Sequence, residues 1–150
     1  MGANLVTGVL RGKFVLVMED EYFIADDIAR ALTKTGAEVV GPFGHVQQGL
    51  ARLKAEPTID FAVLDINLNG AKVFDLAAAL QDRNIPFLFA TGYGNDFLPE
   101  RFARVPRWEK PFDVNSLAKA LEKSCRRSPV RDLNRTGQPC GQGTTTSGEY

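Results

Sequence analysis

Acidic side chains follow two short apolar stretches of the sequence. They are Glu19, Asp20 and Glu21 after the first stretch, and Asp65 after the second. Carboxylates in one pocket repel each other, and at about 4 Å with an effective dielectric constant near 20 each pair costs roughly 4 kcal/mol. A proton or a cation must offset this repulsion. Carboxylate oxygens with room for water suit Mg²⁺, which binds one or two carboxylates together with phosphate oxygens.

A hydroxyl group and an ammonium group follow two later apolar stretches. Thr91 comes directly after residues 85–90, and Lys110 comes directly after residues 105–109. A cation, a lysine and a hydroxyl donor in one place would stabilise negative phosphoryl oxygens. An aspartate beside them, Asp65, could act as a nucleophile and form an aspartyl phosphate. The chemistry that these residue types indicate is phosphoryl transfer to a carboxylate.

Each residue also has an ordinary structural interpretation. Glu19 and Asp20 could cap the helix that follows them, and Asp65 could belong to a turn. Thr91 and Lys110, which Pro111 follows, could be ordinary residues at strand ends. The functional hypothesis therefore depends on whether the fold brings these positions together.

Apolar periodicity between residues 13 and 125 predicts alternating strands and helices. The predicted strands are 14–18, 38–43, 59–64, 85–90 and 105–109, and the predicted helices are 22–35, 46–53, 73–80 and 114–125. Asp113 is the predicted N-cap of the last helix. Glycines and Pro99 between residues 92 and 104 predict a fourth helix that is short or absent.

Strands that alternate with helices predict a parallel sheet with right-handed crossovers and helices on both faces. Five such units predict a flavodoxin-like, doubly wound α/β fold with a five-stranded parallel sheet in the order 2-1-3-4-5. Strands one and three are neighbours in this order, and sites form at the carboxyl ends of the strands. The topology would thus bring Asp20 and Asp65 together, with Thr91 and Lys110 approaching from the neighbouring strands.

The chain has 150 residues, which predicts one folded domain. We expect an N-terminal extension at residues 1–12, a folded domain at 13–125 and a flexible C-terminal tail at 126–150. The tail is rich in Gly, Thr, Arg and Ser and has few apolar residues. A tail of this length cannot form a winged-helix or helix-turn-helix output domain.

Composition argues against two classes of partner, nucleic acid and membrane, and indicates a cellular compartment. Lys and Arg number 18 against 18 Asp and Glu, so the net charge of zero gives no electrostatic support for nucleic-acid binding. No apolar run approaches the roughly 18 residues of a membrane span, and the N-terminus lacks the pattern of a secretory signal. Cys125 and Cys140 form no motif and fit a reducing compartment. These features predict a cytoplasmic protein with no nucleic-acid or membrane partner.

Four stretches of the sequence have a familiar combination of residues. They are VLVMEDE at 15–21, VLDIN at 63–67, FATG at 89–92 and KPF at 110–112. In content and in order they resemble the receiver domain of two-component response regulators, and the resemblance covers residues 13–125.

The resemblance implies a role for each residue at the acidic site. Asp65 would be the phosphoacceptor, Asp20 a direct Mg²⁺ ligand and Glu19 an acidic neighbour that often acts through water. The main-chain carbonyl of Asn67 would be a third protein ligand of the cation.

The resemblance also assigns the two later positions. Lys110 would pair with the acyl phosphate, and Thr91 would hydrogen-bond a phosphoryl oxygen and so report phosphorylation. The bond between Lys110 and Pro111 is expected to be cis, as in the family.

Residues 89–94 resemble an alphaproteobacterial receiver subgroup nicknamed "FAT GUY". The match is partial, because Tyr93 comes one place early and Gly94 stands last. The subgroup is associated with HWE-type sensor histidine kinases, which makes such a kinase an expected partner.

The sequence departs from the family pattern at two places. Arg107 stands where many receivers have an aromatic residue that moves with the threonine, and Trp108 one residue later should face the other way. We expect Trp108 to be a packing residue rather than a partner-contact residue, which is the alternative. The stretch from Thr91 to Lys110 is short and glycine-rich, so phosphorylation could act by ordering a loop there. His45, the only histidine, is predicted to be a surface or capping residue.

The leading hypothesis is a single-domain response regulator. It would take a phosphoryl group from a sensor histidine kinase, or from a histidine phosphotransfer protein, onto Asp65 with the help of Mg²⁺. It would be a signalling protein rather than an enzyme, although it would promote its own phosphorylation and slow dephosphorylation. Its output would be protein contact, phosphorelay or service as a phosphate sink, with a phosphorylation-dependent dimer as one form of contact.

Three alternatives remain at this point. One is a receiver-like binding module that works without phosphorylation, which the missing aromatic residue would suit. Another is a Mg²⁺-dependent phosphohydrolase, although such enzymes usually place a D-x-D pair where this chain has Glu19, Asp20 and Glu21. The last is a flavodoxin that binds FMN, although its phosphate loop would want Gly, Ser and Thr there.

Overall fold

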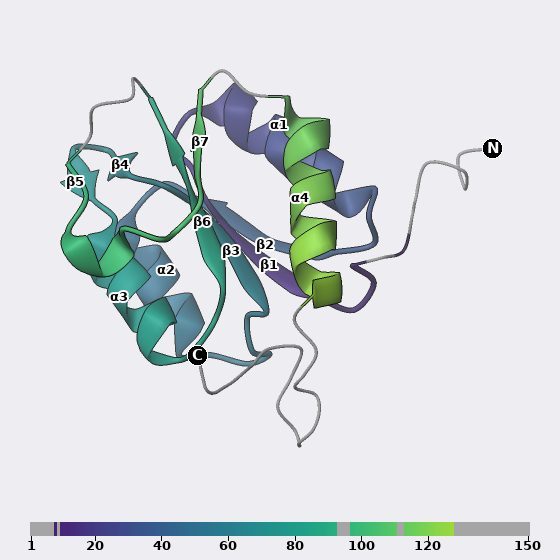
Figure 1. Ribbon diagram of the computed structural model, residues 1–150, viewed down its shortest axis with the longest axis horizontal. Coiled ribbons are helices and arrows are strands. Elements are labelled where there is room, and N and C mark those ends of the chain that lie inside the picture. The colour runs from purple at the N-terminus through teal and green to yellow at the C-terminus, as the bar shows by residue number, and fades with distance from the viewer. Residues whose placement is uncertain (1–7, 9, 93–96, 111–112, 128–150) are drawn as a thin grey trace.

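The structure is a computed structural model that describes residues 8, 10–92, 97–110 and 113–127 (Figure 1). Most of the predicted N-terminal extension and residues 128–150 of the predicted tail lie outside the described residues. Tyr93, Gly94, Pro111 and Cys140 lie outside them too, as does the predicted cis bond before Pro111.

A five-stranded parallel sheet forms the centre of the molecule. Its strands, in spatial order, are β2 (Glu38–Phe43), β1 (Phe14–Met18), β3 (Phe61–Asp65), β6 (Phe87–Thr91) and β7 (Arg107–Glu109). All four pairings are parallel. This is the predicted order, with the strands numbered one to five along the chain.

Strand pairing sets the ends of β3 and β6 later than the apolar pattern alone predicts. Phe61 pairs with Val15 on β1, and Asp65 pairs with Ala90 on β6. Asp65 and Thr91 are therefore the last residues of their strands rather than the first residues after them.

Four α-helices cover the two faces of the sheet. They are α1 (Tyr22–Thr33), α2 (Val46–Leu53), α3 (Phe74–Asp82) and α4 (Val114–Arg127). Figure 1 shows α1 and α4 on one face and α2 and α3 on the other. Alternate side chains of β1 follow this division: Val15 and Val17 join the core under α1 and α4, and Leu16 joins the core under α2 and α3. The doubly wound arrangement is confirmed.

The ends of two helices agree with the prediction. The carboxylate of Asp113 accepts the N–H of Asn115 at 3.1 Å and the hydroxyl of Ser116 at 3.0 Å, so it caps α4. His45 is the N-cap residue of α2, and its N–H donates to the side-chain oxygen of Gln48 at 3.2 Å. The prediction of a capping role for His45 is therefore confirmed.

The described part of the segment between β6 and β7 contains a short 3-10 helix, η2 (Glu100–Phe102), and no α-helix. Phe102 is buried and stacks on Phe74 at 5.7 Å between ring centroids, and it makes a T-shaped contact with Phe89. Arg101 forms an ion pair with Asp82 at 3.1 Å, at the end of α3. This part of the segment is thus tied to the α3 side of the molecule.

Two features were not predicted. Strands β4 (Asn67–Leu68) and β5 (Ala71–Lys72) form an antiparallel hairpin directly after β3. Leu10 is almost fully buried in the core under α1 and α4, and its N–H donates to the carbonyl of Thr35 at 3.0 Å.

Among the described helices, none has the length and hydropathy needed to cross a bilayer.

Candidate functional site

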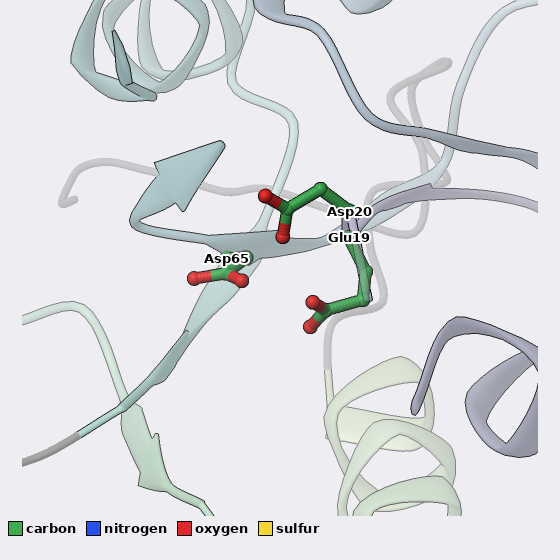
Figure 2. Close-up of side chains that lie close together, drawn as sticks. All are labelled: Glu19, Asp20 and Asp65. Carbon is green, nitrogen blue, oxygen red and sulfur yellow. The ribbon is translucent and has the colours of Figure 1, made fainter. Parts of the chain in front are cut away.

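Three carboxylates meet at the carboxyl end of the sheet (Figure 2). Glu19 and Asp20 follow β1, Asp65 ends β3, and one oxygen from each lies within 4.8 Å of the others. Glu19 and Asp65 are 4% and 6% exposed, whereas Asp20 is open to solvent. Because β1 and β3 are paired neighbours, the sheet itself brings these residues together.

Lys110 extends into the same cluster from the end of β7. Its Nζ lies 2.8 Å from Oε1 of Glu19 and 2.9 Å from Oδ2 of Asp65. The N–H of Lys110 donates to the carbonyl of Thr91 at 2.7 Å, which fixes the lysine against the end of β6. One ammonium group is therefore shared between two buried carboxylates.

Thr91 is the fourth predicted position. It is 2% exposed, and it directly follows Ala90, the residue that pairs with Asp65. The structure thus brings together the four strand ends that the predicted topology placed side by side.

Burial dominates the electrostatics of Glu19. It raises the pKa of this carboxyl from 4.5 to about 7. The close ammonium group of Lys110 and the hydrogen bond from the N–H of Glu21 lower the pKa, whereas the charge of Asp65 raises it. For Lys110, burial by itself would lower the pKa, but the contacts with Glu19 and Asp65 outweigh it and the pKa is raised. The two carboxylates therefore hold Lys110 in its charged form, while burial disfavours the charged form of Glu19.

The donor set of this cluster fits a hard divalent cation. All three side chains offer oxygen, which is the ligand that Mg²⁺ prefers. Oε1 of Glu19 is buried and has no partner in hydrogen-bond geometry, although Nζ of Lys110 lies close to it. Burial is the main reason that the pKa of Glu19 is raised, and the charge of Asp65 adds to it. A cation bound beside these carboxylates would favour the charged form of Glu19.

Asn67 lies beside Asp65, at the start of the β4–β5 hairpin. Its N–H donates to Oδ1 of Asp65 at 3.2 Å, and its side-chain oxygen accepts a hydrogen bond from Lys72 at 2.6 Å. Asp65 therefore has a donor at each oxygen, the Asn67 N–H at one and Lys110 at the other.

Asn69 is a residue of the site that the sequence analysis missed. Its N–H donates to Oδ2 of Asp20 at 2.8 Å, and its side-chain amide donates to the carbonyl of Gly44 at 2.8 Å. The available signal was the Asn-Gly dipeptide at residues 69–70, which favours a two-residue hairpin turn.

The two positions that depart from the receiver pattern face different surroundings. Arg107 is exposed, whereas Trp108 is partly buried and packs against the core under α1 and α4. The prediction that Trp108 is a packing residue is confirmed.

Comparison with known proteins supports the resemblance. The family model described as response regulator receiver domain matches residues 15–122. The transcriptional regulatory protein PdtaR of Mycobacterium tuberculosis is 27% identical over 117 residues, which are 75% of this chain and 57% of that protein. The match therefore spans little more than half the length of this curated relative.

Solved structures agree in fold and, in part, in sequence. SdrG from Sphingomonas melonis Fr1 is 39% identical with a TM-score of 0.63, and the match covers 75% of this chain and 94% of that chain. The receiver domain of NtrX from Brucella abortus is 25% identical with a TM-score of 0.64, and the match covers 76% of this chain and 99% of that chain. The PhyR receiver domain of Erythrobacter litoralis is 21% identical with a TM-score of 0.66, and the match covers 82% of this chain and 98% of that chain. At this identity the similarity supports the fold alone.

Proposed function

Because this chain belongs to the family of response regulator receiver domains, we propose that it accepts a phosphoryl group on Asp65 and signals through protein contacts. Receiver domains are signalling modules that histidine kinases phosphorylate. The observation that carries the proposal is the position of Asp65, nearly buried at the end of β3, 2.9 Å from Lys110 and within an acidic cluster.

The proposed transfer is a displacement at phosphorus. A carboxylate oxygen of Asp65 forms a bond to phosphorus while the bond from phosphorus to the donor's histidine nitrogen breaks, and the imidazole leaves with the electron pair. Such a transfer needs positioning and charge neutralisation more than it needs a base. In this proposal Lys110 forms an ion pair with the acyl phosphate. The hydroxyl of Thr91 donates a hydrogen bond to a phosphoryl oxygen.

Receiver domains bind Mg²⁺ at an acidic pocket, and Glu19, Asp20 and Asp65 form such a cluster here. We assign the cation to Asp20 and Asp65, the main-chain carbonyl of Asn67, and Glu19 through water. When bound, the cation would supply positive charge beside the phosphoryl oxygens.

The proposed partners follow from this function. The donor would be a sensor histidine kinase, including the HWE type, or a histidine phosphotransfer protein, and the similarity to SdrG is compatible with this. The chain would act as a single-domain regulator in the cytoplasm, with residues 13–125 as the receiver. Its output would be a protein contact, a phosphorelay step or a phosphate sink, and dimerisation on phosphorylation is one form of that contact.

Intact mass after incubation with acetyl phosphate tests the proposal. The wild-type chain should gain one phosphoryl group in Mg²⁺ and none in chelator, and Asp65→Asn should gain none in either. Asp60→Asn is the matched control, because Asp60 lies at the other end of β3, where its carboxylate accepts the N–H of Phe14 at 2.8 Å. No uptake by the wild type would overturn the proposal and favour a binding module that works without phosphorylation.

A further inference from the structure

The turn of the β4–β5 hairpin lies close to the acidic cluster. Asn69 and Gly70 form the two-residue loop, with φ of 48° and 85°. A type I′ turn, which fits the twist of a hairpin and favours Asn-Gly, requires positive φ at both of these positions. The turn follows Asp65 by only four residues, so its position also decides where Asn67 lies.

Asn69 joins this turn to two other loops at the same edge of the sheet. Its N–H reaches Asp20 after β1, and its side-chain amide reaches Gly44 after β2, both at 2.8 Å. The first bond occupies one oxygen of the Asp20 carboxylate and fixes its direction. The second bond ties the turn to a loop that carries none of the carboxylates.

We propose that Asn69 is a positioning residue that sets the affinity for the divalent cation. It holds the Asp20 carboxylate, which comes from β1, in place against Asp65 and Asn67, which come from β3 and the hairpin. This inference rests on the proposed function, because it concerns the same acidic site. Asn69 acts through Asp20 and through the turn, and it does not itself bind the cation.

The surroundings of Gly44 agree with a close fit at this junction. A Cβ atom added at Gly44 would lie 3.2 Å from the amide nitrogen of Asn69 and 3.5 Å from Cβ of Asp20. Gly44 does not have a left-handed φ, so its backbone can accept alanine. Alanine at this position would press on Asn69 without straining the chain.

Two variants separate the side-chain tether from the turn itself. Asn69→Gly keeps the N–H that binds Asp20 and suits the positive φ, but it loses the bond to Gly44. Gly44→Ala disturbs the same bond from the other side. Asn84→Gly is the matched control, because Asn84 also has a positive φ of 60° but precedes β6, at the opposite edge of the sheet.

The measurement is Mg²⁺ binding to the unphosphorylated chain by calorimetry, followed by phosphoryl uptake from acetyl phosphate over a range of Mg²⁺. Loss of one hydrogen bond predicts a dissociation constant about three- to tenfold higher for Asn69→Gly and for Gly44→Ala. The Mg²⁺ concentration for half-maximal uptake should rise by the same factor, and the rate at saturating Mg²⁺ should change far less. Asn84→Gly should bind Mg²⁺ as the wild type does.

An unchanged dissociation constant in Asn69→Gly and Gly44→Ala would overturn the inference. An equal rise in Asn84→Gly would also overturn it, because the effect would then be a general loss of turn stability. A wild-type chain that binds Mg²⁺ but takes up no phosphoryl group would instead refute the proposed function. In that case the calorimetry alone decides the role of Asn69 in cation binding.

Discussion

At the scale of the residue, the site is a cluster of negative charge that one lysine only partly neutralises. Lys110 contacts Glu19 and Asp65, and yet the pKa of Glu19 is raised to about 7. The main cause is burial, and the neighbouring charge of Asp65 adds to it. A charged Glu19 is therefore unfavourable in the folded chain unless a cation compensates it.

Glu19→Gln tests this charge balance. In the wild type the folded state holds a proton on Glu19 up to a pH of about 7, whereas the unfolded chain releases it near pH 4.5. Between these values the folded state binds more protons, so stability due to Glu19 falls as pH rises. Glu19→Gln should therefore raise the free energy of unfolding in chelator at pH 8, and do so much less at pH 4.

Urea unfolding of both chains at the two pH values measures this difference. An equal effect of the substitution at pH 4 and pH 8 would contradict a raised pKa for Glu19. The comparison cancels groups that titrate alike in both chains, because the glutamine amide has nearly the shape of the carboxyl group but does not titrate.

At the scale of the element, Phe102 is the fully buried aromatic side chain in the described part of the β6–β7 connection. Phe102 packs against Phe74, Phe87 and Phe89 at ring distances of 5.7, 6.3 and 5.7 Å. Phe97 belongs to the same connection, but it is 78% exposed. The segment thus contains a buried anchor and a matched exposed residue of the same type.

Phe102→Ala should lower the free energy of unfolding by about 3–5 kcal/mol, because it leaves a cavity in the core. Phe97→Ala should change it by less than about 0.5 kcal/mol, because its side chain is already in solvent. Thermal or urea unfolding of the two variants checks this. Similar effects for both would show that η2 does not anchor the connection.

At the scale of the whole molecule, most of the fold follows from the sequence. The alternation of apolar strands and helices predicts the strand order, and that order places Asp20, Asp65, Thr91 and Lys110 at one edge. The apolar pattern does not predict the β4–β5 hairpin, because its strands have two residues each. The hydrogen bond from Asn69 to Asp20 joins residues that are 49 positions apart in the sequence. A local sequence pattern does not predict a contact of this kind, because it depends on how the loops meet in the folded chain.

Removal of the cation should affect the stability of the whole chain. A ligand that binds only the folded state stabilises it by RT ln(1 + [L]/Kd). Mg²⁺ should therefore raise the melting temperature of the wild type, and chelator should reverse the rise. Asp20→Asn should show a much smaller rise, whereas Asp26→Asn on α1, where Asp26 pairs with Arg30 at 2.6 Å, should respond as the wild type does. An undiminished response in Asp20→Asn would place the cation elsewhere.

Chemical trapping shows directly whether the carboxylate of Asp65 carries the phosphoryl group. Borohydride reduces an aspartyl phosphate to homoserine, so treatment of the phosphorylated chain followed by peptide sequencing in a mass spectrometer locates the modified residue. Homoserine should appear at position 65, and only after incubation with both Mg²⁺ and a phosphoryl donor. Homoserine at another aspartate, or a phosphoryl group that resists borohydride, would contradict it.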